Sequence, residues 1–493
     1  MAAAQLVIRN ARILDGTGAP VIEGDVAVTD GRISGVGLLP AGTTGPATVQ
    51  HDAAGAVLAP GFVDVHTHDD GAVLRHPDLA FKVSQGCTSL VVGNCGFSAA
   101  PAVAGERDPS KLLGVTATWS DLAGYREAVA AARPACNAMA LVGHNTVRRL
   151  VMGLERRAPT AGELERMRGE VRRAMQQGAC GFSTGLIYEP GRYSETAEVI
   201  ALAREAAEAG GLYATHLRNE GDRLLDAVDE ALTIGREAGL PVQISHHKSA
   251  GRRNWGRIGE SLARLDAAAA DGLDVTADVY PYTAGSGPMA QYFNLERLDP
   301  ELASVIRFAS CPAMRELEGR MCTEVAAEWG VAPTEVIRRV LTAERGADTI
   351  CIQFIIDEAD IEANLRHPRM MVGSDGIVDL AGRPHPRLFG TFPRVLGHYV
   401  RERHVLGLAE AVRRMTSLSC DRFGLVDRGR VVEGAWADLV VFDEATVADL
   451  ATYDEPQRES AGIRLVCVNG EIAYRYGVHT GVGAGRLLPF SPR

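Results

Sequence analysis

The sequence, 493 residues long, lacks several features that would assign it to a particular class of protein. No stretch approaches the ~18 consecutive apolar residues that a membrane helix needs, and Arg9 interrupts the first apolar residues too early for a secretory signal. A surplus of positive charge is also missing: the formal net charge is −11, which argues against broad contact with nucleic acid. We therefore expect neither a membrane nor a nucleic-acid partner.

Cysteine pairs and lysines are scarce. The nine cysteines include no CxxC pair, and an odd, irregular set in a long chain predicts reduced thiols in the cytoplasm. Only three of the 51 basic residues are lysines (Lys82, Lys111 and Lys248), so a lysine inside a chemical motif is more informative than usual. The remaining composition, 46% hydrophobic and 23% charged, is that of an ordinary soluble globular protein.

Short strands with tight turns occupy both ends of the chain. Residues 1–60 contain apolar runs separated by Asp-Gly turn pairs. The C-terminal segment has the same texture, with an Asn-Gly hairpin signal near its end. This pattern predicts a small sheet domain built from residues 1–60 and 418–493.

The middle of the chain, residues 61–417, alternates short apolar runs with amphipathic helices. One helix begins at the capping box of Thr160, and two others are expected near residues 194–209 and 223–238. The nine apolar runs are GFVDVHTH, TSLVVGNCG, NAMALVGH, CGFSTG, LYATH, PVQISHH, LDVTADVYPY, CIQFII and MMVGSD. Such alternation predicts an α/β fold with a parallel, TIM-like (β/α)8 barrel whose strands are buried on both faces. The surplus run, CIQFII, or the stretch at approximately 290–345 would then belong to an insertion in the barrel.

Metal-binding and acid/base side chains end most of these runs. They are His66, His68, Cys95, His216, His246 and Asp375. The carboxyl ends of the strands of a parallel barrel converge at one face, so these candidates would be neighbours in space. His66 and His68 lie on a strand, where alternate residues point to the same side, and this spacing suits two ligands of one metal ion.

The residues around this histidine pair resemble a known group of enzymes. PGFVDVHTH resembles the opening signature of the amidohydrolase superfamily, whose members carry one or two metal ions at the mouth of the barrel and a β-sandwich made from both chain ends. A carboxylated lysine at the end of the fourth strand usually bridges the two metals in that superfamily. The fourth run, Gly181–Gly185, has no lysine. Cys95 offers instead a thiolate, which binds Zn²⁺ and can bridge two ions.

Seven ordered motifs narrow the resemblance to the D-aminoacylase family, the N-acyl-D-amino-acid deacylases. They are PGFVDVHTHDD, GNCGFS, YATHLRNEG, ISHHK, YPYTAGS, GSDG and RPHPRLFGTFPR. The resemblance implies a hydrolase that uses zinc to cleave the linear amide of an N-acyl-D-amino acid, releasing a carboxylate and a free D-amino acid. It also implies a small-molecule partner and an insertion within the barrel, which agrees with the surplus stretch.

The same resemblance assigns roles to individual residues. It implies two sets of ligands: Cys95, His216 and His246 for a tightly bound zinc, and His66, His68 and Asp375 for a second, weaker metal position. Metal-bound hydroxide would attack the amide, with Asp375 as general base and then general acid. Four further residues would bind the substrate's α-carboxylate. They are Tyr188, Lys248, Ser286 and Arg387, with Arg383 as a competitor for the arginine role.

Several assignments stay open at this point. His144, Asp69 and Asp70 fit either a place beside the site or an ordinary loop position, and His247 is expected to point away from His246. The alternative activity is hydrolysis of a cyclic amide, such as a hydantoin or a dihydropyrimidine, but the missing lysine argues against it. A non-catalytic protein of the same fold would be expected to have lost ligands, and all six are present.

Overall fold

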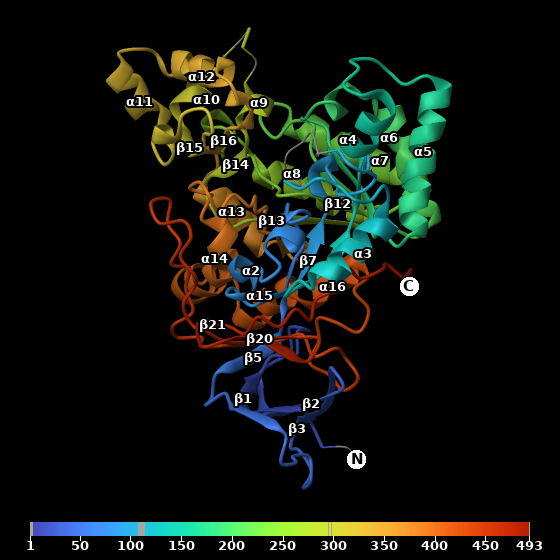
Figure 1. Cartoon of the computed structure of the whole chain (residues 1–493), viewed down its shortest axis with the longest axis vertical. Helices are drawn as coiled ribbons and strands as arrows, with labels where there is room; N and C mark the ends of the chain where they lie inside the picture. Colours follow the sequence, from blue (N-terminus) through green and yellow to red (C-terminus); the bar gives the residue numbers. More distant parts are fainter. Residues whose placement is uncertain (1–2, 107–113, 294, 297, 493) are drawn as a thin grey trace.

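The computed structural model describes residues 3–106, 114–293, 295–296 and 298–492. Lys111 lies outside these residues. Within the described chain, no helix is both long and apolar enough to cross a membrane. Figure 1 shows a sheet from both chain ends at the bottom, the barrel above it, and a smaller sheet at the top left.

The sheet built from both chain ends has nine strands. Their order is β21(Val478–His479), β20(Glu471–Arg475), β19(Ile463–Val468), β18(Leu439–Phe442), β5(Val57–Pro60), β1(Leu6–Ile13), β2(Ile22–Thr29) and β3(Arg32–Gly37), with β4(Val49–Asp52) beside β1. The antiparallel pairing of β5 with β18 joins the N-terminal and C-terminal parts. The expected domain limits, 1–60 with 418–493 and 61–417, stay a prediction.

Eight parallel strand positions surround the centre of the molecule. In order they are β6(Phe62–Asp64), β7(Cys87–Val92), β8(Asn137–Ala140) continued by β9(Val142–Gly143), β10(Gly181–Gly185), β11(Leu212–His216), β12(Val242–Ile244), β13(Val275–Val279) and β17(Met370–Val372). Backbone pairing divides these strands into a three-stranded and a six-stranded sheet. The division falls at the third position, where Leu141 separates β8 from β9. On the other side, a parallel bridge between Thr67 and Gly376 brings the first and last strands together. The predicted TIM-like barrel is confirmed.

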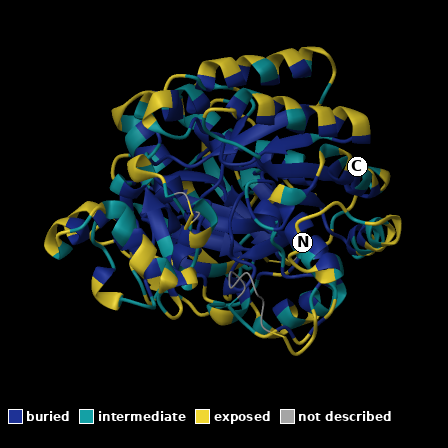
Figure 2. Ribbon diagram, turned by 90° about the horizontal axis from the view of Figure 1, so that it is seen from above, coloured by how far each residue is buried: buried dark blue, intermediate teal, exposed yellow. Residues whose placement is uncertain are grey.

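Helices cover the outside of this barrel. They are α1(Ala72–Arg75), α2(Ala80–Val83), α3(Leu122–Ala132), α4(His144–Met152), α5(Ala161–Gln176), α6(Thr196–Glu208), α7(Leu224–Ala238), α8(Ile258–Ala270), α13(Glu358–Arg366), α14(Arg387–Arg394), α15(Leu408–Met415) and α16(Ser417–Phe423). Thr160 and Glu163 form the capping box at the start of α5, and Gly239 ends α7 with a φ of +77°, as the sequence predicted. Figure 2 shows the resulting layers, with buried strands at the centre and exposed helix faces outside.

A three-stranded antiparallel sheet lies apart from the barrel strands. It consists of β14(Gly285–Pro288), β16(Ile350–Gln353) and β15(Ile306–Ser310), with the short helices α9(Met289–Tyr292), α10(Pro300–Ser304), α11(Cys322–Trp329) and α12(Pro333–Thr342). Phe308, Val325 and Ile337 belong to a buried core of its own. The surplus run CIQFII supplies the central strand of this sheet and takes no part in the barrel.

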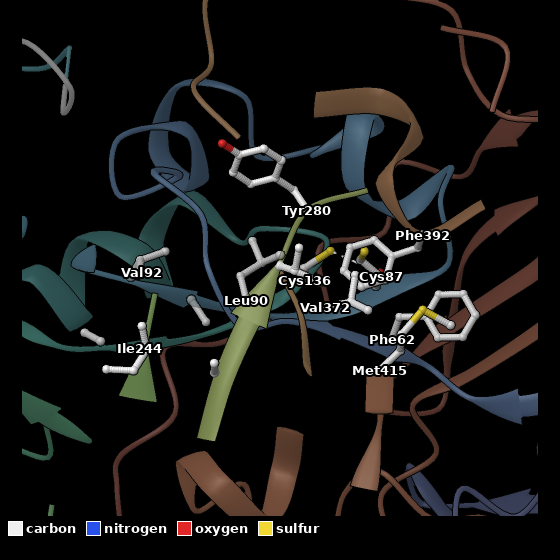
Figure 3. Packing of buried hydrophobic residues seen from close by; sticks show 14 of the residues in the cluster. Phe62, Cys87, Leu90, Val92, Cys136, Ile244, Tyr280, Val372, Phe392 and Met415 are labelled. Carbon is white, nitrogen blue, oxygen red and sulfur yellow. Dashed lines mark hydrogen bonds between the residues drawn. The ribbon is translucent and has the colours of Figure 1, made fainter. Parts of the chain in front are cut away.

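Apolar side chains pack densely beneath the strand ends, as Figure 3 shows. The ring of Phe62 stacks on that of Phe392 with centroids 5.7 Å apart, and the Cys136 thiol donates to the Cys87 carbonyl. All nine cysteines are buried and unpaired.

Candidate active site

The six candidate ligands gather at the carboxyl ends of the barrel strands. His66 and His68 follow β6, Cys95 follows β7, His216 ends β11, His246 follows β12 and Asp375 follows β17. Three of them adopt a left-handed backbone that side chains other than glycine rarely take: φ is +55° at Cys95, +35° at His246 and +49° at Asp375. Such strain is retained where the surrounding structure enforces it, and it gathers at functional sites.

Cys95 lies at the centre of the cluster. Its Sγ is 3.3 Å from Nε2 of His66, 3.4 Å from Nε2 of His246 and 3.8 Å from Nδ1 of His216. Zn–S and Zn–N bonds of about 2.3 and 2.0–2.1 Å separate a sulfur from a nitrogen by ~3.6 Å around one tetrahedral ion. The Cys95 contacts are close to this spacing, and the ligand atoms of Cys95, His66 and His246 all lie within 4.8 Å of one another.

A second group of ligands shares the His66 side of the cluster. Oδ1 of Asp375 lies 3.3 Å from Nε2 of His68 and 3.5 Å from Nε2 of His66. The three side chains are all buried and their ligand atoms lie within 4.8 Å of one another. Because His66 also approaches Cys95, the two groups form one continuous cluster.

Opposite charges face one another within this cluster. Burial by itself raises the pKa of the Cys95 thiol, but the imidazoles of His66 and His246 lower that pKa well below its ordinary value. Burial also raises the pKa of Asp375, yet Arg387 and the histidines hold it well below the usual range. Although burial opposes protonation of His68, its hydrogen bond to Asp375 contributes to raising its pKa to about 9. Both lowered pKa values favour the anionic forms of Cys95 and Asp375.

Two acidic residues that sequence reasoning missed orient these ligands. Asp278, on β13, accepts a hydrogen bond from the backbone N–H of His246 at 2.8 Å and lies 3.5 Å from Nδ1 of His66. Glu220 lies 3.0 Å from Nδ1 of His246 and 3.6 Å from Nε2 of His216. Carboxylates in such positions fix the orientation of ligating imidazoles. Glu220 lies within the motif YATHLRNEG, and Asp278 within the run LDVTADVYPY, so both were visible as acids near strand ends.

A sealed group of charges lies beside the ligands. The ammonium of Lys82 is 2.5 Å from Asp64, 3.2 Å from Asp69, 3.1 Å from the Thr67 hydroxyl and 2.9 Å from the Ser374 hydroxyl. Although burial lowers it, the pKa of Lys82 is raised by the two carboxylates. Thr67 lies between the paired histidines, and Ser374 precedes the aspartate of GSDG. Lys82 therefore fixes the loop after the first strand against the loop after the last.

The four expected substrate-binding residues lie around this cluster in different settings. Lys248 donates to Glu220 at 2.5 Å, and Arg387 lies 3.0 Å from Asp375. The Tyr188 ring is 4.6 Å from that of His216. Ser286 contributes its backbone carbonyl, which accepts a 3.2 Å hydrogen bond from Arg387.

Arg383, the competitor for the arginine role, is exposed and donates to the backbone carbonyl of Asp454. Arg387 has the better position, since its guanidinium lies 4.5 Å above the ring of Tyr280 and beside Asp375. The Tyr280 hydroxyl and Nε of Arg387 are buried atoms without a hydrogen-bond partner among the described residues. Figure 3 shows this hydroxyl directed away from the apolar core. Tyr280 is the first residue of the motif YPYTAGS, but the sequence alone did not identify it as a site residue.

The assignments that the sequence left open have structural answers. His247 points away from the cluster and contacts the side chains of Asn364 and Ser261. His144 pairs with Glu198 at 2.8 Å on the outer side. Asp69 and Asp70 are buried and not solvated. Asp69 pairs with Lys82, and Asp70 accepts backbone hydrogen bonds from Gly93 and Ala99.

Two cavities open onto the cluster from different sides. The larger, about 1270 Å³, is lined by His216, Lys248 and Tyr280. The smaller, about 220 Å³, is lined by His68 and Cys95. The two cavities adjoin, since both are lined by Tyr188, Glu189, Ser286, Ala290, Gln291 and Asp375.

Comparison with known proteins places the chain in a defined group. The model of the amidohydrolase family matches residues 51–288 and 262–474. An N-acyl-D-glutamate deacylase of Alcaligenes xylosoxydans xylosoxydans is 44% identical over 94% of this chain and 92% of its own length. A D-aminoacylase of the same organism is 43% identical over 98% and 97% of the two chains.

A solved structure extends this similarity to three dimensions. The N-acyl-D-glutamate deacylase of Bordetella bronchiseptica, complexed with zinc and a phosphonate inhibitor that mimics the tetrahedral intermediate, has a TM-score of 0.90. It is 42% identical, and the match covers 99% of this chain and 100% of that one. The likeness thus includes the barrel, the terminal sheet and the smaller sheet together.

Proposed function

The chain belongs to the D-aminoacylase branch of the amidohydrolase family, and on that premise we propose that it hydrolyses N-acyl-D-amino acids to a carboxylate and a free D-amino acid, using zinc. The observation that carries the proposal is the convergence of three imidazoles on the Cys95 sulfur beside Asp375. The relatives described above are named as an N-acyl-D-glutamate deacylase and a D-aminoacylase, and these names support the proposal.

The proposed ligands of the tightly held zinc are Cys95, His216 and His246, and those of a second, weaker position are His66, His68 and Asp375. The sulfur–nitrogen separations around Cys95 support the first set, and the short contacts of Asp375 support the second. Zinc bound there supplies a Lewis acid, which polarises an amide carbonyl and lowers the pKa of water to roughly 7.

Asp375 is proposed to move the protons of the reaction. Its lowered pKa keeps it ionised at neutral pH, so it can accept a proton from the attacking water. Arg387 lies beside Oδ2, at 3.0 Å, and leaves Oδ1 on the side of the ligand cluster. The carboxylic acid formed there can then give its proton to the departing nitrogen, which leaves as the amine.

The substrate's α-carboxylate is proposed to bind in the larger cavity. Lys248 and Tyr280 line that cavity, and Arg387 lies against the Tyr280 ring. The partnerless Nε of Arg387 and hydroxyl of Tyr280 are donors that a carboxylate oxygen can satisfy. Tyr188 and Ser286 remain proposed contacts on the same side. A cyclic-amide hydrolase has less support, because β10 offers no lysine and these cations suit a free carboxylate.

The test is amine release from N-acetyl-D- and N-acetyl-L-amino acids carrying leucine, methionine, phenylalanine, aspartate or glutamate side chains. We expect turnover by the zinc-loaded protein to be confined to the D forms, and the preferred side chain identifies the natural substrate class. No turnover of any D form with zinc bound, or equal turnover of the L forms, contradicts the proposal.

A further inference from the structure

The two cavities at the cluster share part of their walls and differ in the rest. Cys95 and His68 line only the smaller cavity, whereas His216 and Lys248 line only the larger one. Both reach Asp375. A molecule whose reacting bond lies beside Asp375 therefore extends in two directions, into two chemically distinct spaces.

Charged side chains are more numerous in the larger cavity. Its walls carry many ionised side chains, among them Lys248, Arg252, Arg253 and Asp222. Arg253 is paired with Asp222 at 2.7 Å. This space suits the polar, charged part of a ligand and is wide enough to admit water.

The smaller cavity has mixed walls: Arg149, Glu189 and Asp375 bring charge to one part, and apolar side chains form another. Phe97 follows the Cys95 loop, Pro288 ends β14, and Ile377 follows the Asp375 loop; all three are partly buried. Leu154, just beyond α4, forms part of the outer rim and is 52% exposed. A volume of about 220 Å³ corresponds to roughly seven water molecules of the liquid. The apolar part of this cavity therefore suits a short aliphatic chain.

We propose that the smaller cavity binds the acyl group of the substrate, and that Leu154 at its rim selects the length of the acyl chain. This inference rests on the proposed deacylase function. An N-acyl amino acid has a charged end and an acyl end on opposite sides of its amide bond. With the carboxylate held near Lys248 and Arg387 and the amide beside Asp375, the acyl chain points into the apolar space.

The apolar walls predict a graded preference. Each methylene that leaves water for such a wall improves kcat/KM about fourfold, because burial of one CH₂ has that effect on an equilibrium. Acyl chains of about four to six carbons on one D-amino acid should therefore be better substrates than acetyl. The gain should end where the chain passes Leu154 and re-enters water.

Leu154→Trp tests the assignment, because an indole at the rim narrows the cavity without touching the ligand cluster. We measure kcat/KM for the acetyl, butyryl and hexanoyl derivatives of one D-amino acid, and for the acetyl derivatives of several D-amino acids. The expected result is at least a tenfold fall for hexanoyl relative to acetyl, with side-chain preference unchanged within about twofold. Leu150→Trp, one turn earlier on α4 and outside both cavity walls, is the matched control and should leave the acyl preference unchanged.

The outcomes separate this inference from the proposed function. An unchanged hexanoyl-to-acetyl ratio in Leu154→Trp, or a change in side-chain preference instead, overturns the acyl site while deacylation stands. A similar effect of Leu150→Trp also overturns it, since the effect would then not come from the cavity. Failure of the wild-type protein to release amine from every D substrate overturns the proposed function and the acyl site together.

Discussion

The two described lysines, Lys82 and Lys248, lie in two contrasting regions of the strand-end face. Lys82 has no exposed surface and is surrounded by four oxygen-bearing side chains. Lys248 has 7% of its side chain exposed, contacts Glu220 and His246, and lines the larger cavity. A lysine thus holds two loops together where it is fully buried, and it can reach a ligand where it lines the cavity.

The comparison also explains why lysine is retained in a chain whose other basic residues are arginines. A compact ammonium with three donors fits among the closely spaced oxygens of Asp64, Asp69 and Ser374. A planar guanidinium needs a wider space. Rarity in the sequence drew attention to Lys248, which lies in the motif ISHHK, but not to Lys82, which lies in none of the motifs.

Lys82→Met tests the sealed region and carries the largest expected effect on stability. Removal of the ammonium leaves Asp64 and Asp69 buried without their cation, so we expect the free energy of unfolding to fall by about 3–5 kcal/mol. Denaturant unfolding of the zinc-loaded protein measures it. Arg223→Met, which breaks an exposed pair with Asp226, is the control and should cost under about 1 kcal/mol. An equal fall in the free energy of unfolding of the two variants would show that the buried Lys82 contributes no more than an exposed ion pair.

Lys248→Met tests the open region, where activity should suffer more than stability. Loss of a charge-assisted hydrogen bond to the α-carboxylate should lower kcat/KM about 10- to 100-fold, mainly through KM. The measurement compares an N-acyl-D-amino acid with its uncharged α-carboxamide. On the carboxamide, kcat/KM of the variant should equal that of the wild type, because this substrate has no carboxylate for Lys248 to bind. An equal loss on both substrates would mean that Lys248 acts only by holding Glu220 and His246.

His385 gives the smallest expected effect and tests how the open region depends on pH. Its Nε2 donates to the Ala284 carbonyl and its Nδ1 accepts the backbone N–H of Arg387. Burial and the nearby Arg387 charge hold the pKa of His385 well below 6.5. The folded state therefore binds fewer protons than the unfolded state, and the stability present above pH ~6.5 is lost as the pH falls.

One such proton changes the free energy of unfolding by at most about 1.4 kcal/mol per pH unit. Unfolding curves at pH 7 and pH 5.5 should show a smaller pH dependence for His385→Gln than for the wild type. His398→Gln, on a partly exposed surface, serves as the control. A pH dependence identical in the wild type and His385→Gln would show that His385 does not titrate on unfolding.

The convergence of the six candidate ligands followed from the sequence because parallel strands bring their carboxyl ends together. The run ending in Cys95 and the run ending in Asp375 are 280 residues apart, yet barrel geometry alone made them neighbours. The alternation of runs and helices likewise predicted the barrel, and the surplus run CIQFII was correctly suspected of lying outside it.

The supporting residues were not predictable in the same way. Lys82 lies on a four-residue helix, and three of its partners precede or follow ligands on distant loops, so no periodicity links them. Asp278 and Glu220 look like ordinary acids until the rings of His66 and His246 are placed beside them. The division into two cavities depends on how β14 and the loops beyond it pack, which a single sequence does not encode in any local pattern.

The most direct test of the central claim is the zinc content and turnover of Cys95→Ala beside those of Cys87→Ala. Cys87 is buried in β7 and belongs to none of the groups of possible metal ligands among the described residues. We predict that Cys95→Ala loses the tightly held zinc and at least about 10³-fold in turnover of an N-acyl-D-amino acid, while Cys87→Ala retains both. Near-normal zinc content and turnover in Cys95→Ala would contradict a catalytic site centred on this thiolate.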